Sequence, residues 1–350
     1  MLTAVHSHDT RLHEPKGEVW VGVEIAGTEV PERVDALERA LVAAGATMIR
    51  ANAGDRSDLH RVHDPAMVEF LATAFHRWAE SGYPTDPGQG RVVPYAFPLR
   101  QMTSGRPPHR PASIGAETGM WAMDTMTLIG RGSWEAIEAA AFCALTAADL
   151  LERGPVYALC RPPGHHAGRD FYGGSCYLNN AALAAQRLRD RGAGTVAVID
   201  VDAHHGNGTQ EIFYERADIR YGSVHVDPGE GWFPHFVGYA DEVGAGPGKR
   251  ANLNLPMAPG TGDDGWVAGV DRLVDFAAGS DAVVVSLGVD AAAGDPESPL
   301  EITADGYRQA GAVVAGLGVP TVIVQEGGYD LHTLGDLVVS FLTGLTHPRG

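Results

Sequence analysis

The chain has 350 residues, of which 44% are hydrophobic and 20% are charged, a composition typical of a globular protein with a sizeable core. Its 44 acidic residues outnumber its 26 basic ones and give a net charge of −18, which argues against nucleic-acid binding because phosphates attract basic surfaces. Such a charge attracts cationic substrates, although it also promotes solubility whatever the function.

The cysteines and the absence of apolar runs bear on where the protein works. Cys143, Cys160 and Cys176 are too few and too scattered for a disulfide framework, and their apolar surroundings favour buried free thiols in a reducing compartment. No apolar run is long enough to span a bilayer, and MLTAVHSHDT lacks the features of a secretory signal. We therefore expect a cytoplasmic protein that does not act on a membrane.

The first third of the chain is irregular. Residues 32–80 indicate helices but no evident set of core strands, and residues 81–115 are dense in proline and glycine. Long irregular segments in compact proteins are often functional, so we interpret 81–115 as an ordered insertion loop within a single domain that spans residues 1–350. The alternative is a flexible linker.

From about residue 133 onward, short β-branched runs alternate with amphipathic stretches. The predicted strands are 155–160, 195–202, 219–227, 281–290 and 320–328. The predicted helices are 134–153, 178–191, 264–278, 303–317 and 331–345. This alternation predicts an α/β fold, in which an open, mostly parallel sheet is sandwiched by helices.

Polar residues that are unfavourable to bury without a partner lie at or just after the ends of four predicted strands. They are His165 and His166, then Asp200, Asp202 and His204, then Asp290, and finally Tyr329. Each has an ordinary alternative role on its own, such as capping a helix, but ligand sites in open parallel sheets lie beyond the carboxyl ends of the strands. We expect Asp202 and His204, two apart on a strand, to point the same way. With Asp290 they provide three ligands and an open position, which is typical of catalytic zinc.

Four motifs carry a family resemblance. RPPGHHAG, DVDAHHGNGTQEIFY, LGVDAAAGDP and QEGGYDLHTLG occur in this order and resemble the arginase/deacetylase superfamily. Within it, the chain is most similar to class II-type histone deacetylases and to bacterial acetylpolyamine amidohydrolases, which CYLNNAALAAQRL, WFPHFVGYADEVG and FPLR also resemble. The resemblance implies an arginase/deacetylase fold and a zinc-dependent hydrolase of linear amides.

The resemblance also implies the catalytic roles. Asp202, His204 and Asp290 would hold one Zn²⁺ per chain, which polarises the acetyl carbonyl and lowers the pKa of its bound water towards about 7. His166 matches the general base and acid, His165 its charge-adjusting partner, and Tyr329 the hydroxyl that donates to the oxyanion. The neighbours that would fix the histidine tautomers are Asp200 for His165 and Asn207 for His166.

A second, structural cation is implied beneath the zinc. Asp200 and Asp202, the Ser223 hydroxyl and the carbonyls of His204 and Val224 match the inner potassium site of the family. A monovalent cation there would offset the accumulated carboxylate charge.

The positions that line the substrate channel in the family depart from its pattern here. Gly174 lies in the expected tight loop, and Trp232 and Phe233 match the channel-lining loop. Ser175 stands where family members usually place an aromatic ring. Gly115 and Met126 fall where the amidohydrolases carry carboxylates that recognise polyamines.

Glu297 favours a cationic substrate. It follows Asp290 at the spacing of an acidic gatekeeper in a polyamine-preferring animal deacetylase, and a carboxylate there would attract an ammonium group. The loop 81–115 resembles one through which bacterial amidohydrolases form homodimers and narrow the entrance.

We therefore predict a deacetylase of small, cationic N-acetylated amines, with acetylpolyamines as the leading class. Lysine deacetylation on proteins or peptides and tailoring of an acetylated metabolite remain alternatives, the latter suggested by Ser175. A non-catalytic binder is disfavoured because the histidines and Tyr329 are all present. A binuclear manganese site like that of the arginases would need more bridging ligands. The sequence leaves open whether the catalytic metal is zinc or iron(II).

Overall fold

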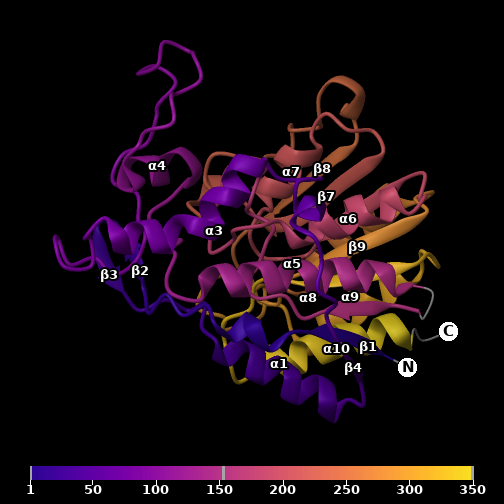
Figure 1. The fold of residues 1–350 in the computed structure, drawn as a ribbon. Coiled ribbons are helices and arrows are strands. Elements are labelled where there is room, and N and C mark those ends of the chain that lie inside the picture. Colours follow the sequence, from indigo (N-terminus) through magenta and orange to yellow (C-terminus); the bar gives the residue numbers. More distant parts are fainter. Residues whose placement is uncertain (1, 152–153, 348–350) are drawn as a thin grey trace.

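A parallel β-sheet forms the centre of the computed structural model, which describes residues 2–151 and 154–347 (Figure 1). The strand order is β4-β1-β5-β10-β9-β6-β7-β8, and each neighbouring pair is parallel. The strands are β1 (Thr3–His6), β4 (Thr47–Arg50), β5 (Val156–Ala158), β6 (Val196–Asp200), β7 (Ile219–Val226), β8 (Asn252–Met257), β9 (Ala282–Leu287) and β10 (Thr321–Gln325). The predicted α/β fold is confirmed.

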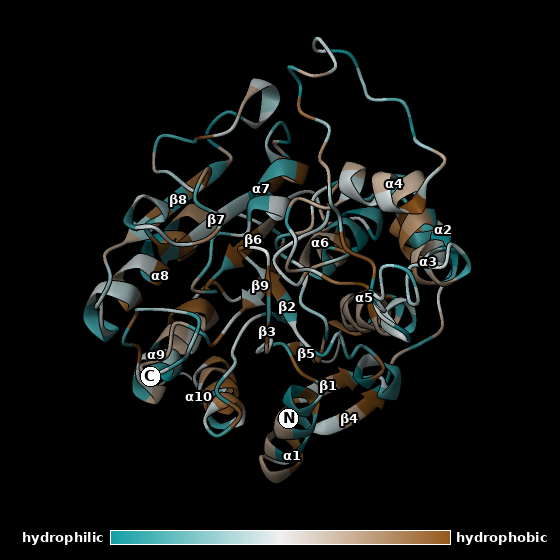
Figure 2. Cartoon of the chain, turned by 90° about the vertical axis from the view of Figure 1, so that its left-hand side faces the viewer, coloured by the Kyte–Doolittle hydropathy of each residue, from teal (hydrophilic) through white to brown (hydrophobic). Residues whose placement is uncertain are grey.

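Helices cover both faces of the sheet (Figure 2). The longer ones are α1 (Glu32–Ala43), α3 (Pro65–Glu80), α5 (Ser133–Asp149), α6 (Asn180–Asp190), α8 (Asp263–Ala277), α9 (Ala304–Ala315) and α10 (Leu334–Thr346). The shorter ones are α2 (Arg56–Leu59), α4 (Ile114–Trp121) and α7 (Asn207–Phe213). Val196 and Val198 of β6 pack towards α3, α5 and α6, whereas Ala197 and Ile199 pack towards α1, α8, α9 and α10. This alternation of side chains along a strand produces two apolar cores.

The predicted elements after residue 133 are present, and most are shorter than expected. Each of the five predicted strands contains a strand of the sheet, and each of the five predicted helices overlaps a helix, although α5 and α8 begin one residue earlier and α10 ends one residue later than predicted. Helix α5 ends at Asp149, and residues 152–153 of the predicted helix 134–153 lie outside the described residues.

The expectation that residues 32–80 contribute no core strand was wrong. β4 lies in this segment and pairs with β1 at the edge of the sheet. Its four residues, TMIR, are partly exposed and too few to display an alternating pattern. The strands β1 and β8 were also not anticipated.

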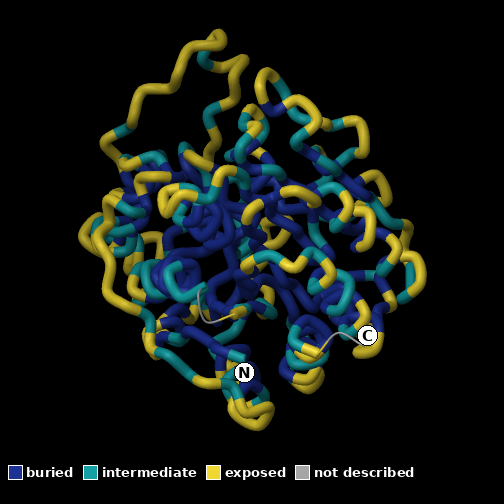
Figure 3. The backbone as a smooth tube through the Cα atoms, turned by 90° about the vertical axis from the view of Figure 1, so that its right-hand side faces the viewer, coloured by how far each residue is buried: buried dark blue, intermediate teal, exposed yellow. Residues whose placement is uncertain are grey.

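Two segments extend over the carboxyl-end side of the molecule. An antiparallel hairpin consists of β2 (Glu18–Trp20) and β3 (Val23–Ile25). Residues 98–110 form a long, mostly exposed excursion (Figures 1 and 3). Glu117 on α4 pairs with Arg77 and Arg110 at its base. The last two residues of the predicted loop 81–115 belong to α4.

Within the described residues, no helix is both long and apolar enough to cross a membrane. Cys143, Cys160 and Cys176 are free and buried, as predicted.

Candidate active site

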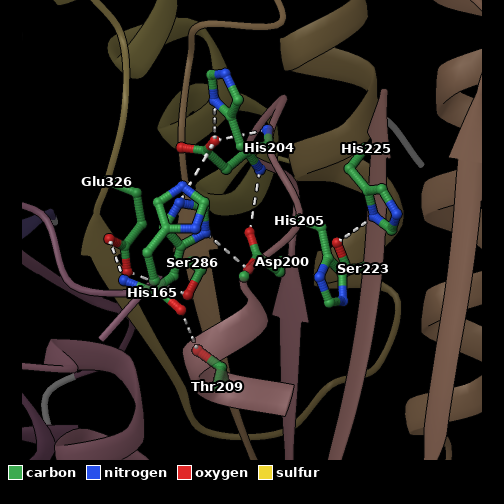
Figure 4. Close-up of polar contacts among 12 residues, drawn as sticks. His165, Asp200, His204, His205, Thr209, Ser223, His225, Ser286 and Glu326 are labelled. Atoms are coloured by element: carbon green, nitrogen blue, oxygen red, sulfur yellow. Dashed lines mark hydrogen bonds and ion pairs between the residues drawn. The ribbon is translucent and has the colours of Figure 1, made fainter. Parts of the chain in front are cut away.

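The sheet order brings the four polar strand ends together. β5, β10, β9 and β6 are consecutive in the sheet, and their parallel carboxyl ends meet at one edge. Figure 4 shows His165, Asp200, His204 and Glu326 gathered there. Residues far apart in sequence therefore form one buried polar cluster.

Asp202, His204 and Asp290 form a compact group at this edge. One ligand atom from each lies within 4.8 Å of the others. His204 Nδ1 is 3.3 Å from Asp202 Oδ1 and 3.0 Å from Asp290 Oδ2. The expectation that Asp202 and His204 share a strand was wrong, because β6 ends at Asp200. A turn in which the Asp202 carboxylate accepts the backbone N–H of His204, at 2.9 Å, holds both side chains together instead.

Backbone N–H groups orient the two carboxylates. Ala203 N donates to Asp290 Oδ1 at 2.8 Å, and Gly327 N donates to Asp202 Oδ2 at 2.8 Å. A side chain at Gly288 or Gly327 would collide with these carboxylates, so glycine is required for the close approach.

Asp202, His204 and Asp290 shift one another's pKa values. Burial and the neighbouring Asp202 carboxylate raise the pKa of Asp290 to about 7. Burial works against protonation of His204, but the two carboxylates outweigh it and raise its pKa well above the ordinary value. Two buried carboxylates and one imidazole are a donor set suited to a divalent transition metal, which would offset their repulsion.

The paired histidines have different partners. His165 Nδ1 lies 3.1 Å from Asp200 Oδ2, and His166 Nδ1 lies 2.7 Å from Asn207 Oδ1. Burial disfavours a charged His165, but Asp202 and Asp200 outweigh it and raise its pKa to about 10. Burial, together with His165 and His204, lowers the pKa of His166 well below its ordinary value. The surroundings therefore shift the two pKa values in opposite directions, favouring the charged form of His165 and the neutral form of His166.

Tyr329 is half-buried and lies beyond β10. Its backbone N–H donates to Asp295 Oδ2 at 2.8 Å, and the Arg33 guanidinium lies 4.8 Å from the centroid of its ring. Arg33 also donates to the carbonyls of Glu326 and Gly328, on either side of the turn that precedes Tyr329. These contacts fix the direction in which the phenol leaves the sheet.

The residues of the expected potassium site are adjacent. Asp200 and Ser223 are register partners across β6 and β7, and Val224 follows on β7, fully buried. Burial raises the pKa of Asp200, although His165 opposes this shift. The Ser223 hydroxyl lies 2.7 Å from His225 Nδ1 (Figure 4).

A cavity of about 380 Å³ opens beside His166, His204 and Tyr329, and all five predicted substrate residues line it. They are Gly174, Ser175, Trp232, Phe233 and Glu297, and His166, His204 and Tyr329 line it with them. Gly174 and Ser175 both adopt a positive φ, and the Phe233 ring lies edge-on to His166 at 4.8 Å between centroids. Met126 also lines the cavity. Gly115, which is on α4, packs against Tyr83 and does not line the cavity.

Sequence reasoning missed several residues of the site. Asp295 joins the two sides of the cavity because it accepts from the N–H groups of Glu297 and Tyr329. Glu326 accepts from the N–H groups of Gly164 and His165 at 2.7 and 3.1 Å. Both acids stand inside motifs singled out in the sequence, LGVDAAAGDP for Asp295 and QEGGYDLHTLG for Glu326, and that position was the available signal.

Most of the other missed residues come from the first third of the chain. Arg33 and Arg161 both pair with the buried Glu29, at 2.9 and 2.8 Å. Glu18 and Trp20, on the hairpin, line the cavity. No pattern in residues 1–35 marks Glu18, Trp20 or Arg33 as part of the site, whereas Arg161 lies inside the motif RPPGHHAG.

Comparisons with known proteins agree with this geometry. Residues 27–345 match a family model described as the histone deacetylase domain. An acetylpolyamine amidohydrolase of Mycoplana ramosa is 41% identical over 349 residues, which cover 98% of this chain and 99% of that protein. One from Burkholderia pseudomallei is 40% identical and covers 100% of both chains. A crystal structure of the acetylpolyamine aminohydrolase from Burkholderia pseudomallei superposes with a TM-score of 0.91 at 38% identity over 100% of both chains.

Proposed function

Because the chain belongs to the histone deacetylase domain family, we propose that it removes the acetyl group from small N-acetylated amines, with acetylpolyamines as the leading class. The family and the full-length relatives make the chain a deacetylase, an enzyme that hydrolyses amides. One observation supports the proposal above all: two histidines and a phenol, His166, His204 and Tyr329, line a single cavity.

We assign the metal position to Asp202, His204 and Asp290, and expect one Zn²⁺ per chain. The fit rests on three buried donors within 4.8 Å of one another and on two carboxylates that repel each other without a cation. Bound zinc supplies a Lewis acid that polarises the acetyl carbonyl and activates water. The same nitrogen and oxygen donors also suit iron(II).

His166 is the proton carrier in this proposal. Its Nδ1 faces the amide oxygen of Asn207 and so carries the hydrogen, which leaves Nε2 free to accept a proton from the attacking water. The same nitrogen then returns the proton to the leaving amine. His165, paired with Asp200, adjusts the charge beside it. The Tyr329 hydroxyl donates a hydrogen bond to the oxyanion as it develops.

Glu297 favours a cationic substrate. It lines the cavity, and its carboxylate would attract the free ammonium group of an acetylated amine. Gly174, Trp232 and Phe233 form the wall along the alkyl chain of the acetylated amine. Ser175 places no aromatic ring at its own position in that wall, so lysine deacetylation or the tailoring of a larger acetylated metabolite remains the alternative.

We assign a structural K⁺ to a set of oxygen donors beneath the proposed zinc position. They are Asp200, Asp202, the Ser223 hydroxyl and the carbonyls of His204 and Val224. The adjacency of Asp200 and Ser223 in the sheet supports this assignment. The buried position of Asp200, beside a second carboxylate, is where a monovalent cation offsets charge.

We propose a single deacetylase domain over residues 1–350 that pairs as a homodimer through the loop at 81–115. One sheet contains strands from β1 to β10, which supports the single domain. Tyr95, Leu99 and Met102 are 72%, 62% and 76% exposed on the loop, and a partner subunit would cover them. The three buried free thiols suit a reducing compartment such as the cytoplasm.

Acetate release from N8-acetylspermidine tests the proposal. Protein stripped with a chelator should release none, and one equivalent of Zn²⁺ should restore the activity. Zinc-loaded His166→Ala should stay inactive while its circular dichroism spectrum matches that of the wild type. Undiminished acetate release by the stripped protein would contradict the metal assignment.

A further inference from the structure

A second group of possible metal ligands lies where the end of β1 meets α1. His6 is the last residue of β1, His8 begins the 3₁₀ helix η1 (His8–Arg11), and Glu38 lies in α1. One ligand atom from each lies within 4.8 Å of the others. All three are described residues, and none of them lines the active-site cavity. The proposed deacetylase chemistry therefore gives them no role.

A short turn fixes the two histidines relative to each other. The Ser7 hydroxyl accepts the backbone N–H of Asp9 at 3.3 Å, and the Thr10 hydroxyl donates to the Ser7 carbonyl at 2.7 Å. The backbone of His6 is held at the sheet, because its carbonyl accepts the N–H of Ala51 at 2.8 Å. The two imidazole rings lie edge to face, with 5.4 Å between their centroids. Secondary structure, and not a flexible tail, therefore brings the two imidazoles together.

Glu38 is held so that one carboxylate oxygen faces the histidines. Its Oε1 lies 3.1 Å from His6 Nδ1, and its Oε2 accepts from Arg11 Nη2 at 2.6 Å. The second guanidinium nitrogen, Nη1, is more distant from Oε1, at 3.5 Å. A carboxylate whose other oxygen is bound by a neighbouring donor is fixed in direction, and contacts of this kind orient the ligands of metal sites.

The charges around the group favour a cation. Arg11 also pairs with Asp35, at 2.8 Å, so two carboxylates share one guanidinium and keep one negative charge beside the imidazoles. His8 is exposed and forms no side-chain hydrogen bond or ion pair with the described residues, so its ring nitrogens are available to a ligand. Two imidazoles and one carboxylate are a donor set that suits zinc and the neighbouring divalent metals.

We propose that His6, His8 and Glu38 bind a divalent transition-metal ion at a site separate from the catalytic position. The bound ion joins the end of β1 to α1, and water occupies its remaining coordination position. The ligands come from three elements that only the folded chain brings together, so the ion stabilises the folded state. This inference is independent of the proposed function, because it holds whatever the substrate of the enzyme is.

Zinc uptake is the first test. Untagged protein, stripped with a chelator, is titrated with Zn²⁺ against a chromophoric chelator that competes for the ion. The wild type should take up one equivalent per chain more than His8→Gln, because two remaining ligands hold zinc poorly. His8→Gln should keep the wild-type rate of acetate release. Equal uptake by the two proteins would overturn the proposal, and this comparison decides it whether or not the catalytic position binds zinc.

His76→Gln is the matched control. His76 is another exposed histidine, and its Nε2 lies 3.1 Å from Glu80 on the same helix. Within residues 2–151 and 154–347, no third ligand joins this pair. The variant should take up as much zinc as the wild type. If it loses an equivalent as His8→Gln does, exposed histidines in general held that ion, and the proposal fails.

Thermal unfolding gives a readout that does not depend on counting ions. The additional equivalent of Zn²⁺ should raise the melting temperature of the wild type by about 2–4 °C, because the ion binds the folded chain. The same addition should leave the melting temperatures of His8→Gln and Glu38→Gln unchanged. No rise in the wild type, or an equal rise in the variants, would overturn the proposal.

Discussion

Tyr329 depends on contacts that its own motif does not contain. Asp295 accepts its backbone N–H, and Arg33 lies against its ring while it binds the carbonyl of Gly328. Arg33 in turn pairs with the buried Glu29. The position of the phenol is therefore set by residues from both ends of the chain, which favours a fixed donor over a mobile one.

Removal of the phenolic hydroxyl tests its role. Tyr329→Phe should lower kcat by about 10²–10³-fold, the scale for the loss of one oxyanion donor. Zinc content and the melting temperature should match the wild type, because the backbone contacts of residue 329 remain. Steady-state kinetics on an acetylated diamine, with metal analysis of the same sample, makes the measurement. An unchanged kcat would remove Tyr329 from the chemistry.

His63 is a histidine outside the catalytic cluster that makes the stability of the folded chain depend on pH. It is fully buried, its Nδ1 lies 2.9 Å from the carbonyl of Gly168, and its Nε2 accepts the backbone N–H of Asn179 at 2.9 Å. Burial lowers its pKa from 6.5 to about 4. The unfolded chain takes up the proton below pH 6.5, whereas the folded chain does so only near pH 4. The stabilisation is complete above pH 6.5 and is lost as the pH falls towards 4.

The size of this effect is about 3 kcal/mol in the free energy of unfolding, at 1.36 kcal/mol per pKa unit. His63→Gln should therefore lose less stability than the wild type between pH 7 and pH 4.5, measured by urea unfolding. His76→Gln, at a side chain that is 78% exposed on α3, should keep the wild-type dependence. Parallel curves for His63→Gln and wild type would contradict the assignment.

At the scale of elements, the sequence predicted the second half of the fold better than the first. After residue 133, apolar strands buried on both faces alternate with amphipathic helices, and this pattern is plain in the sequence. β1, β4 and β8 have four to six residues each, and β4 lies exposed at the sheet edge. Their place in the sheet comes from pairing partners distant in sequence, which local patterns do not reveal.

The candidate site follows the same division. The proposed metal ligands and the paired histidines follow strands inside recognisable motifs, so their convergence follows from the order of parallel strands. Glu18, Arg33 and Asp295 act through tertiary contacts, and a glutamate on a short strand or an arginine on a helix has an ordinary surface role in most chains. Only the folded chain brings Glu18 to the cavity and brings Arg33 and Asp295 against Tyr329.

Gly288, which follows β9, allows a test of the proposed metal ligands. A Cβ at Gly288 would overlap Asp202 Oδ2 and push the carboxylate away from His204. Gly288→Ala should weaken zinc binding by about 10–100-fold in a chelator competition. Gly90→Ala, where nothing lies within 4 Å of the added carbon, should bind zinc as the wild type does. Wild-type affinity in Gly288→Ala would mean that Asp202 is not a ligand.

At the scale of the whole molecule, the exposed loop offers a test of assembly. Residues 98–110 stand apart from the sheet and are mostly exposed (Figure 3). Their apolar side chains Leu99 and Met102 are 62% and 76% exposed. Replacing them by a short Gly-Ser linker should convert a dimer to a monomer in analytical ultracentrifugation. Since the loop contributes little to the two cores, the melting temperature should change little. A monomeric wild type would contradict the proposed homodimer.

The acidic surface and the carboxylates of Glu18 and Glu297 in the cavity together favour small cations over acetylated proteins. The most direct test is kcat/KM of the zinc-loaded enzyme on N-acetylputrescine, N8-acetylspermidine and an acetyl-lysine peptide under identical conditions. We predict that the better acetylpolyamine exceeds the peptide by at least about tenfold, the scale of one well-placed charge. Equal or greater kcat/KM on the peptide would contradict the account and identify the chain as a lysine deacetylase with an open channel at Ser175.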